Sequence, residues 1–484
     1  MRQNLEKIKK GLIFLKDKDY IKAEIFFLNL VRKNPSDIQI YSYLIPALIE
    51  QKKFSDALKF SERLFNLNKK NELGLIYIGI INYNLKEYPL AFEFFERALL
   101  INPKNFDALL NIGVTFRKLG DNLKAIEYFE KSLNINPMKS IVFYNLGSVY
   151  EEECDLEKAM MFFKKAISLN SKDFDSIHAF SLCQLTMHNF NEGLINYELR
   201  WFKKDFEKYR YKHFPKLESL ESILGKKILI WYEQGMGDTI QFSRYIQSLI
   251  ILGADVTFEV QKPLLKFLKR QFSCEVTDDA SNKKFDFQCP LMGLPKLFNM
   301  NLENIPSIKK YFKCDNKKFY FWRDILPLSK NKKNIGIAIS GNVNQIYENR
   351  RRIDLNYFKS LAENFKIFII QKNLYENDEI ILNKSYDIEF LGKKDQWKDF
   401  EDTSAIVENM DFIVSIDTSL IHLASSMNKK SFLLLSKSAD WRWSHHKLST
   451  PNWYNNLTII RQKTKDNWES VILEINKCLN HQSV

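Results

Sequence analysis

Apolar positions in the first 170 residues recur at helical spacing, and the whole pattern repeats every 34 residues. Within one unit, from Phe106 to Lys139, two amphipathic segments flank a Gly-Asp turn, and Pro137 closes the unit. These signals predict two helices per unit. Each unit leaves an apolar face that only the next unit covers, so the pattern predicts a solenoid.

Columns of small and aromatic residues carry the register of the repeat. Alanine fills one column five times, and glycine, phenylalanine and proline fill others in most units. The glycine is expected to let the second helix cross close to the first, and the alanine to accept the bulk of a neighbour. The members are Ala23, Ala57, Ala91, Ala125 and Ala159; Gly11, Gly79, Gly113 and Gly147; Phe27, Phe95, Phe129 and Phe163; and Pro35, Pro103 and Pro137.

These units resemble tetratricopeptide repeats (TPRs), with five units in one register from Asn4 to Asp173. A degenerate sixth unit, from Phe174 to Glu207, is expected to cap the stack. The second unit departs from the pattern, because Ile45, Ser61 and Lys69 stand in the glycine, aromatic and proline columns. The resemblance implies a concave surface that binds a peptide, a protein or another subunit.

Composition changes after residue 200, since all eight tryptophans lie at or beyond Trp201. The charged stretch 208–225, which contains Pro215, is predicted to be a linker running over the repeat cap. The change indicates a domain boundary. The predicted domains are a solenoid over 1–207 and two further domains over 226–330 and 331–484.

Beyond the linker, short apolar runs alternate with helical patterns, which is typical of βαβ units. The predicted strands are KILIWY, DVTFEV and FDFQC, then NIGIAIS, KIFIIQ, IEFLG, FIVSID and KSFLLLS, with a closing helix from Asp466 to Leu479. The pattern predicts two facing Rossmann-like α/β domains. Because ligands of such sheets bind beyond the carboxyl ends of the strands, we expect any site to lie in the cleft between the two domains.

The composition is that of a soluble globular protein: of 484 residues, 45% are hydrophobic, 27% charged and 14% aromatic. No apolar run approaches the roughly 18 residues that a membrane span needs, and the N-terminal sequence has no secretion-signal pattern. The six cysteines lack the spacing of a zinc site or a disulfide framework. We therefore expect a cytoplasmic protein without a bound metal.

Lys and Arg outnumber Asp and Glu by 72 to 59, which gives a formal net charge of +13 and a weak attraction for anions. The basic residues are dispersed and no nucleic-acid-binding motif accompanies them, so we expect no nucleic-acid partner. A phosphorylated small molecule would use the same charge. A nucleic-acid-binding repeat protein remains a third interpretation.

The first candidate site follows the strand KILIWY, in WYEQGMGDTIQF. Gly235 and Gly237 are two of only 15 glycines, and they are expected to permit positive φ and close approach of a ligand to the backbone. A helix is expected to begin at Asp238. There the carboxylate either caps the helix together with Gln241, or acts as a general base on an acceptor hydroxyl during group transfer.

The second candidate site is FIVSIDTSLIHLASSMN, where a strand ends at Asp417 and a helix begins with Thr418, Ser419 and His422 in its first turns. The free N–H groups of this helix terminus suit a diphosphate. The terminus alone supplies too little energy, so Arg350 to Arg352 are candidates for further cations. The alternatives are a satisfied, partly buried histidine at 422 and a solvated charged face for the arginines.

A third polar exit follows the strand NIGIAIS, at Ser340, Gly341 and Asn342. An ordinary turn is the alternative interpretation of these three residues.

Together these segments resemble bacterial TPR proteins whose C-terminal part is similar to the ADP-heptose:lipopolysaccharide heptosyltransferases, a group of GT-B glycosyltransferases. The likeness covers Ile228 to Glu474 and is strongest in WYEQGMGDTIQFSRY and SIDTSLIHLA. It implies a GT-B-type pair of Rossmann-like α/β domains after the all-α solenoid, with Asp238 as the base. It also implies a donor diphosphate site lined by Asp417, Thr418 and His422.

The chain departs from these families at two places. Ser419 stands where heptosyltransferases usually have glycine, and Gln345 and Glu348 replace a His and an Asp of the repeat-bearing relatives, so that only Arg351 keeps their arginine. The donor-binding residues expected here are Gly237, Ser340, Asn342, Arg351, Asp417, Thr418, Ser419 and His422.

The preferred hypothesis is a cytosolic glycosyltransferase that uses a nucleotide-diphosphate sugar and needs neither cofactor nor metal. Its acceptor, a protein side chain or a surface glycan, would be presented by the solenoid, which is also expected to bind a protein partner. The alternative is a scaffold whose glycosyltransferase-like half has lost catalysis and mediates protein–protein interaction.

Overall fold

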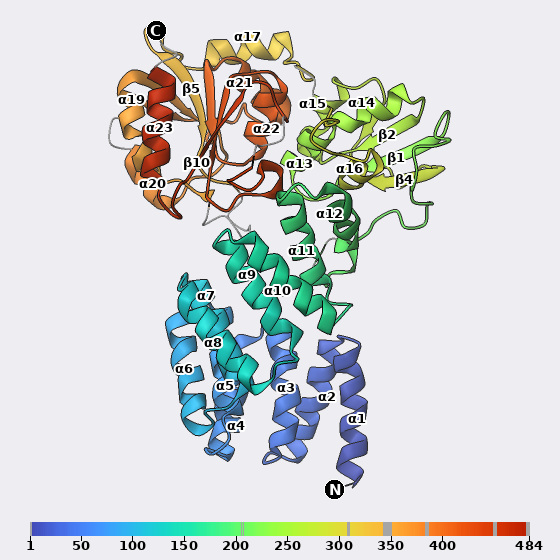
Figure 1. Cartoon of the computed structure of the whole chain (residues 1–484), viewed down its shortest axis with the longest axis vertical. Helices are drawn as coiled ribbons and strands as arrows, with labels where there is room; N and C mark the ends of the chain where they lie inside the picture. Colours follow the sequence, from blue (N-terminus) through green and yellow to red (C-terminus); the bar gives the residue numbers. More distant parts are fainter. Residues whose placement is uncertain are drawn as a thin grey trace. The chain divides into compact units, whose positions relative to one another are not determined.

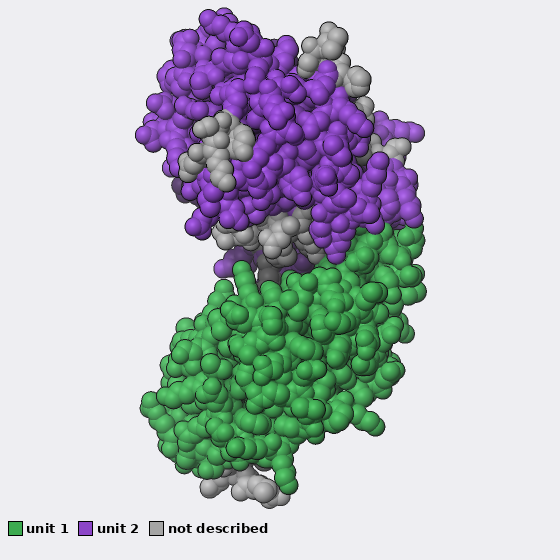
Figure 2. All heavy atoms as spheres, turned by 90° about the vertical axis from the view of Figure 1, so that its left-hand side faces the viewer, with its two compact units in different colours: residues 1–176 green, residues 177–484 purple. Residues whose placement is uncertain are grey.

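The structure is a computed structural model, and it divides into two compact units, Met1–Ser176 and Ile177–Val484 (Figure 2). It describes residues 2–204, 206, 208–306, 310–341, 351–382, 387–448 and 453–480.

The first unit is built from antiparallel helix pairs, as the 34-residue period predicts (Figure 1). Successive helices alternate between the first and second position of a repeat. Their bounds are α1 (Arg2–Lys16), α2 (Tyr20–Lys33), α3 (Ile38–Glu50), α4 (Phe54–Leu67), α5 (Leu73–Asn84), α6 (Tyr88–Ile101), α7 (Phe106–Leu119), α8 (Asn122–Ile135), α9 (Ser140–Glu152) and α10 (Leu156–Leu169).

The glycine column lies directly against the phenylalanine column of the same repeat. A methyl group on Gly113 would lie 2.5 Å from Cε1 of Phe129, and one on Gly79 would lie 2.5 Å from Cε1 of Phe95. The ring therefore fills the space that a side chain would need. This confirms the prediction that the glycine permits close crossing of the two helices.

The second repeat exchanges the two sizes. Ile45 takes the glycine position and Ser61 the phenylalanine position, and both are fully buried. The hydroxyl of Ser61 donates to the carbonyl of Ala57 at 2.7 Å, so its burial leaves no unsatisfied donor. A large residue on the first helix and a small one on the second conserve the volume between the helices, which cores tolerate well.

The turn inside each repeat places one residue in the left-handed conformation. These positive-φ residues continue at intervals of 34: Lys18, Lys52, Lys86, Gly120, Cys154 and His188. Only one of the six is a glycine, so the remaining five hold a conformation that disfavours side chains. His188 carries the same turn into the predicted sixth repeat.

That sixth helix pair is part of the second unit. The helices α11 (Phe174–Thr186) and α12 (Phe190–Tyr197) lead into a 3-10 turn, η1 (Glu198–Phe202). Leu185, Phe190 and Leu194 share one buried cluster with strand residues of the α/β region. This pair was predicted to cap the solenoid. Its apolar face instead lies in the core of the second unit.

A four-stranded parallel sheet forms the first lobe of the second unit, which we define as residues 227–306. The strand order is β3-β2-β1-β4. The elements are β1 (Lys227–Trp231), α13 (Met236–Phe242), α14 (Arg244–Ile251), β2 (Asp255–Glu259), α15 (Lys262–Lys269), β3 (Glu275–Thr277), β4 (Phe287–Pro290), η2 (Leu291–Gly293) and α16 (Leu294–Leu297).

One face of this sheet is covered by the predicted linker. Leu229 and Trp231 of β1 pack against Trp201, Tyr209 and Tyr211. The backbone beyond them runs beside β4, since the Leu217 N–H donates to Gln288 O at 2.8 Å and the Gln288 N–H to Pro215 O at 2.8 Å. Residues 208–225 were predicted to run over the repeat cap. They do contact that predicted unit, at Trp201 and Glu198, and their aromatic side chains also bury one face of the sheet.

The second lobe, defined as residues 333–480, holds a six-stranded parallel sheet of order β10-β9-β8-β5-β6-β7. Counted from β5, this is the order 3-2-1-4-5-6 of doubly wound sheets. The strands are β5 (Lys333–Ala338), β6 (Phe365–Ile369), β7 (Ile388–Phe390), β8 (Phe412–Ser415), β9 (Ser431–Leu435) and β10 (Leu457–Arg461).

Helices cover both faces of this sheet (Figure 1). Ile335 and Ile337 of β5 face the cluster that contains α23, while Ala338 faces the cluster that contains α21 and α22. The helices are α17 (Asn316–Ile325), η3 (Leu355–Phe358), α19 (Lys359–Asn364), α20 (Glu376–Leu382), α21 (Phe400–Glu408), α22 (Ser419–Ser426), η4 (Trp441–Trp443) and α23 (Glu469–Asn480).

All the predicted strands are present, and the predicted closing helix is α23. The edge strands β3 and β10 and the helices α17 and α20 were not predicted. In β10 only Ile460 is buried, so its pattern gave no clear strand signal. None of the helices in the described ranges is both long and apolar enough to cross a bilayer.

Candidate functional site

The sequence motifs meet at the carboxyl ends of the two parallel sheets. The loop after β1 opens into α13, and the loop after β8 opens into α22. Both sheets reverse their strand order beside these strands, between β1 and β4 and between β5 and β8. In doubly wound sheets this switch point is where ligands bind.

Gly237 of the first lobe lies against the N-terminal turn of α22. A methyl group at this position would lie 3.1 Å from Cδ2 of His422 and 3.5 Å from Cα of Ser419. The glycine thus permits two backbones to approach one another. It was predicted to supply positive φ, but Gly237 lies within α13 and the positive φ of this loop, 61°, belongs to Gln234.

Asp238 is the third residue of α13, which begins at Met236 and not at Asp238 as predicted. Its Oδ2 accepts the backbone N–H of Gly235 at 2.8 Å, so the carboxylate caps the helix by reaching back, and Gln241 takes no part. Its Oδ1 pairs with Nη2 of Arg442 from the second lobe. Asp238 therefore caps the helix, as one of the two interpretations predicted, but without Gln241. The ion pair with Arg442 was not predicted from the sequence.

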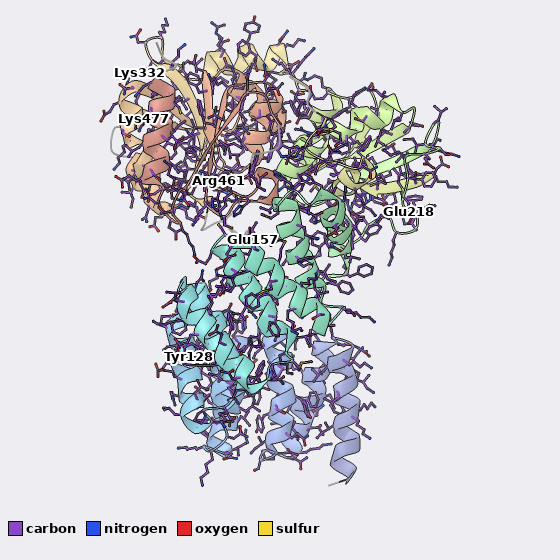
Figure 3. The ribbon with its side chains drawn as sticks, in the orientation of Figure 1. Tyr128, Glu157, Glu218, Lys332, Arg461 and Lys477 are labelled. Carbon is purple, nitrogen blue, oxygen red and sulfur yellow. The ribbon has the colours of Figure 1, made fainter. Side chains whose placement is uncertain are left out.

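Arg442 lies in η4, on the loop that follows β9, and its side chain is 8% exposed. Its Nη1 also contacts Oδ1 of Asp440 at 2.6 Å. Arg461 of β10, labelled in Figure 3, fixes this loop, because it donates to the carbonyls of Trp443 at 2.6 Å and Ser444 at 3.2 Å. One guanidinium is thus held between two carboxylates at the junction of the lobes.

His422 is 3% exposed and is held on three sides. Its Nδ1 lies 2.9 Å from the hydroxyl of Tyr454, its Nε2 lies 3.4 Å from Oδ1 of Asp417, and its ring stacks on Trp443 at 5.6 Å. The alternative interpretation of a satisfied, buried histidine is confirmed. Its position beside Gly237 nonetheless puts it at the junction of the two motifs.

Asp417 ends the extended segment after β8 and faces His422. Burial opposes its ionisation, yet hydrogen bonds from His422 and Trp443 and the charge of Arg351 hold the pKa of this carboxyl below its ordinary value. The carboxylate is therefore ionised at neutral pH. Its role in this arrangement is to orient the imidazole of His422 and to balance nearby cations.

Thr418 is the N-cap of α22 and has extended backbone dihedrals, but its side chain makes no capping hydrogen bond. Its hydroxyl lies 3.0 Å from that of Ser415. Ser419 is the first helical residue and is half-buried. Because the Thr418 side chain does not cap α22, the first N–H groups of the helix are left to meet an oxyanion.

The three arginines of the predicted run do not act alike. Arg351 donates from Nη1 to the backbone carbonyl of Asp417 at 2.9 Å, which brings its charge to the start of α22. Arg352 turns to Asp378, at 3.1 Å, and stacks over Tyr375, at 3.9 Å. Arg350 lies outside the described residues. Of the two described arginines of this run, Arg351 is therefore the one that reaches the site.

Ser340 follows β5 and is joined to Gln371, which follows β6. The Gln371 amide donates to Ser340 Oγ at 2.7 Å, and its carbonyl accepts the N–H of Ile339 at 2.9 Å and of Ser340 at 3.3 Å. Gln371 thus fixes the strand exit beside the switch point. Asn342, Gln345 and Glu348 lie outside the described residues.

A buried ion pair fixes the glycine loop that follows β1. Glu233 and Arg200 are both 0% exposed and form two hydrogen bonds, of 2.8 and 2.9 Å. Glu233 also accepts the N–H of Met292, after β4, at 3.0 Å. Burial raises the pKa of Glu233, although Arg200 opposes the shift. This pair links η1 to the ends of β1 and β4, and so positions the glycine loop.

Sequence reasoning found the two motifs but missed their partners Arg442, Tyr454, Gln371 and Arg200. Arg442 left one signal, its position between two tryptophans in ADWRWSHH. Buried aromatic neighbours indicate a guanidinium that is held in place. Within the described ranges no three His, Cys, Asp or Glu side chains cluster as a metal site would require.

Comparison with known proteins identifies the helical part. The model of the tetratricopeptide repeat family matches residues 106–137 and 141–173. The N-terminal region therefore contains tetratricopeptide repeats, which are compatible with protein–protein interaction. No curated protein matches the chain.

Solved structures similar to the chain are TPR proteins. The thermophilic TPR protein TTC0263 of Thermus thermophilus has 18% identity and a TM-score of 0.36, covering 38% of this chain and 100% of its own. PilF of Pseudomonas aeruginosa has 17% identity and a TM-score of 0.33, covering 40% of this chain and 86% of its own.

Proposed function

We propose that the second unit is a glycosyltransferase that transfers a sugar from a nucleotide-diphosphate sugar to an acceptor hydroxyl. The proposal rests on one observation, the direct packing of the Gly235–Asp238 loop of the first lobe on the start of α22 in the second. This brings a carboxylate and an uncapped helix terminus to the same junction. The resemblance of both motifs to the heptosyltransferases supports the same reaction and a GT-B arrangement of the lobes.

In this proposal the donor diphosphate lies at the N-terminus of α22. The N–H groups of Ser419 and its successors, the hydroxyl of Thr418 and the guanidinium of Arg351 balance its charge. The acceptor oxygen attacks the anomeric carbon while the bond from that carbon to the diphosphate oxygen breaks. The acceptor proton passes to Asp238, and the nucleoside diphosphate leaves. In this proposal Arg351 and the N-terminus of α22 neutralise the diphosphate as a metal ion does in other transferases, so the reaction requires no metal ion.

Arg442 gives this mechanism a conformational requirement. Asp238 accepts a proton poorly while its Oδ1 is paired with a guanidinium, because the positive charge stabilises the ionised form. The incoming diphosphate carries more negative charge than the carboxylate of Asp238, so it competes for the guanidinium of Arg442. Transfer of Arg442 from Asp238 to the diphosphate would free the base only when donor is bound.

The first unit would serve the reaction by presenting the acceptor. TPR solenoids bind extended peptides on their concave face, so an acceptor protein, or a protein that carries the surface glycan, fits this role. Transfer to a protein acceptor should then need both units, whereas slow hydrolysis of the donor should need only the second.

A scaffold without catalysis is the second candidate. It is favoured by the state of the two key side chains: both oxygens of Asp238 are occupied, and His422 is locked by Tyr454. In a scaffold these contacts would fasten the two lobes permanently.

The deciding experiment is sugar-nucleotide turnover by the full chain, with a panel of donors, alongside calorimetry with the same nucleotides. We expect Asp238→Ala to lower turnover about 10²- to 10⁴-fold with little change in donor affinity. Arg351→Ala should weaken donor binding. Arg352→Ala should leave donor affinity unchanged, although loss of its pair with Asp378 is expected to change the stability of the protein. Absence of both turnover and nucleotide binding would favour the scaffold. Unchanged turnover in both Asp238→Ala and Arg351→Ala would show that these roles are wrong.

A further inference from the structure

A hollow of about 680 Å³ opens in the second unit among residues of α15, α17 and α21 and of the turns that flank them, apart from the residues of the candidate site. Five basic and two acidic side chains line it. Neither Arg351 nor any residue of the α22 motif is among them. Its volume lies within the range of pockets that hold small molecules.

The acidic groups at the floor of the hollow are already neutralised. Glu401 is 5% exposed and is bound by Arg270 through two hydrogen bonds, of 2.9 and 3.0 Å. Below the lining, Asp402 is 2% exposed and holds Lys318 at 2.6 Å. Arg270 and Lys318 are thus paired with buried carboxylates. The remaining lysines of the lining supply the positive charge that a ligand in solution would meet.

Three lysines form the rim: Lys266 and Lys269 from α15, and Lys317 from α17. All three are exposed. Within the described part of the chain none of them pairs with a carboxylate. The other acidic residue of the lining, Asp315, accepts the N–H of Lys318 at 2.9 Å as the N-cap of α17. An excess of positive charge therefore surrounds the opening.

The placement of Lys317 and Lys318 is unfavourable for the helix itself. Both lie in the first turn of α17, where the helix dipole disfavours cations. Lys266 and Lys269 add like charges across the same hollow. A bound anion would relieve both effects, and a ligand with several anionic groups would relieve them most.

We propose that this basic hollow binds a soluble small molecule with two or more phosphate groups. The phosphates contact Lys266, Lys269 and Lys317, while the floor pairs of Arg270 and Lys318 stay intact. A compact polyphosphate fits better than a nucleic acid, because the cations gather around one open hollow and do not follow a stripe along the surface. The site is independent of the glycosyltransferase proposal.

The test is calorimetric titration of the full chain with tripolyphosphate at low salt. The variant carries Lys266→Gln, Lys269→Gln and Lys317→Gln, and the matched control carries Lys208→Gln, Lys212→Gln and Lys226→Gln, three exposed lysines that do not line the hollow. We expect the rim variant to bind about tenfold more weakly or worse, and the control within about twofold of the native chain. A single Lys317→Gln variant, with thermal melting of every protein, keeps the result interpretable if the triple variant unfolds.

Four outcomes would overturn the proposal. The first is no measurable binding of tripolyphosphate by the native chain, and the second is equal weakening in the rim variant and the control. The third is tighter binding of a single-stranded RNA than of tripolyphosphate, with the RNA affinity lost in the rim variant. Loss of binding in Arg351→Gln but not in the rim variant would assign the anion to the candidate donor site and would equally exclude the hollow.

Discussion

The carboxylate of Asp238 and the guanidinium of Arg442 form an ion pair between residues 204 positions apart in the sequence. Their side chains are 15% and 8% exposed. The pair joins the helix that begins in the first lobe's glycine loop to the loop that follows β9 in the second lobe. It therefore fastens the two lobes to each other beside the candidate site.

Removal of Arg442 should destabilise the second unit. Arg442→Gln leaves Asp238 without its cation in a mostly buried setting, which costs about 3 kcal/mol. All eight tryptophans lie at or beyond Trp201, so tryptophan fluorescence during urea unfolding reports on this unit alone. Lys393→Gln, in an exposed pair with Glu379 of the same unit, is the control and should cost less than about 1 kcal/mol.

The two functions of Asp238 can be separated by two substitutions. Asp238→Asn keeps an oxygen for the N–H of Gly235 but loses the charge, whereas Asp238→Ala loses both. The alanine variant should be about 1 kcal/mol less stable than the asparagine variant, which is the usual value of a helix cap. Equal unfolding free energies of the two variants would mean that the capping bond contributes nothing.

The size exchange in the second repeat predicts a rescue in the fourth. Gly113→Ile should destabilise the solenoid by about 1–3 kcal/mol, since the new side chain meets the ring of Phe129. Adding Phe129→Ser recreates the Ile45 and Ser61 arrangement and should recover part of that loss. Thermal unfolding followed by circular dichroism measures both. A double variant less stable than Gly113→Ile alone would contradict the volume argument.

Glycine at the repeat turns should stabilise the first unit. Lys52 holds φ of 60°, so Lys52→Gly relieves about 1 kcal/mol of backbone strain and should raise the melting temperature. Lys59, an exposed residue inside α4, is the matched control, because Lys59→Gly should lower stability by a similar amount. Lys52→Gly and Lys59→Gly should thus change stability in opposite directions. A decrease of similar size at both positions would contradict the strain assigned to the turn.

His178 should make the second unit less stable in mild acid. Burial, aided by the charges of Lys203 and Arg200, lowers its pKa to about 3 from the ordinary value of 6.5. Between these two values the unfolded chain binds a proton that the folded chain does not, so stability falls as the pH is lowered from about 6.5 toward 3. In His178→Gln the slope of unfolding free energy against pH should decrease by about one proton in this window. An unchanged slope would contradict the assignment.

Local pattern was sufficient for several features of this protein. The 34-residue columns predicted the helix pairs and the close crossing at the glycine column, because each repeat packs chiefly within itself and on its neighbours. The alternation of strands and helices gave two parallel sheets. It also placed Asp238 and Thr418 at strand exits, since a parallel sheet brings all its carboxyl ends to one edge.

What only the tertiary structure decided is how side chains distant in sequence are paired. The sequence motifs do not show that Arg442 holds Asp238, that Tyr454 holds His422, or that Arg351 and Arg352 turn to different partners. Likewise, aromatic residues of the predicted linker cover the first sheet. Periodicity records which face of an element is buried, whereas these contacts depend on the distance and direction between elements, which are set only when the sheets and their loops pack together.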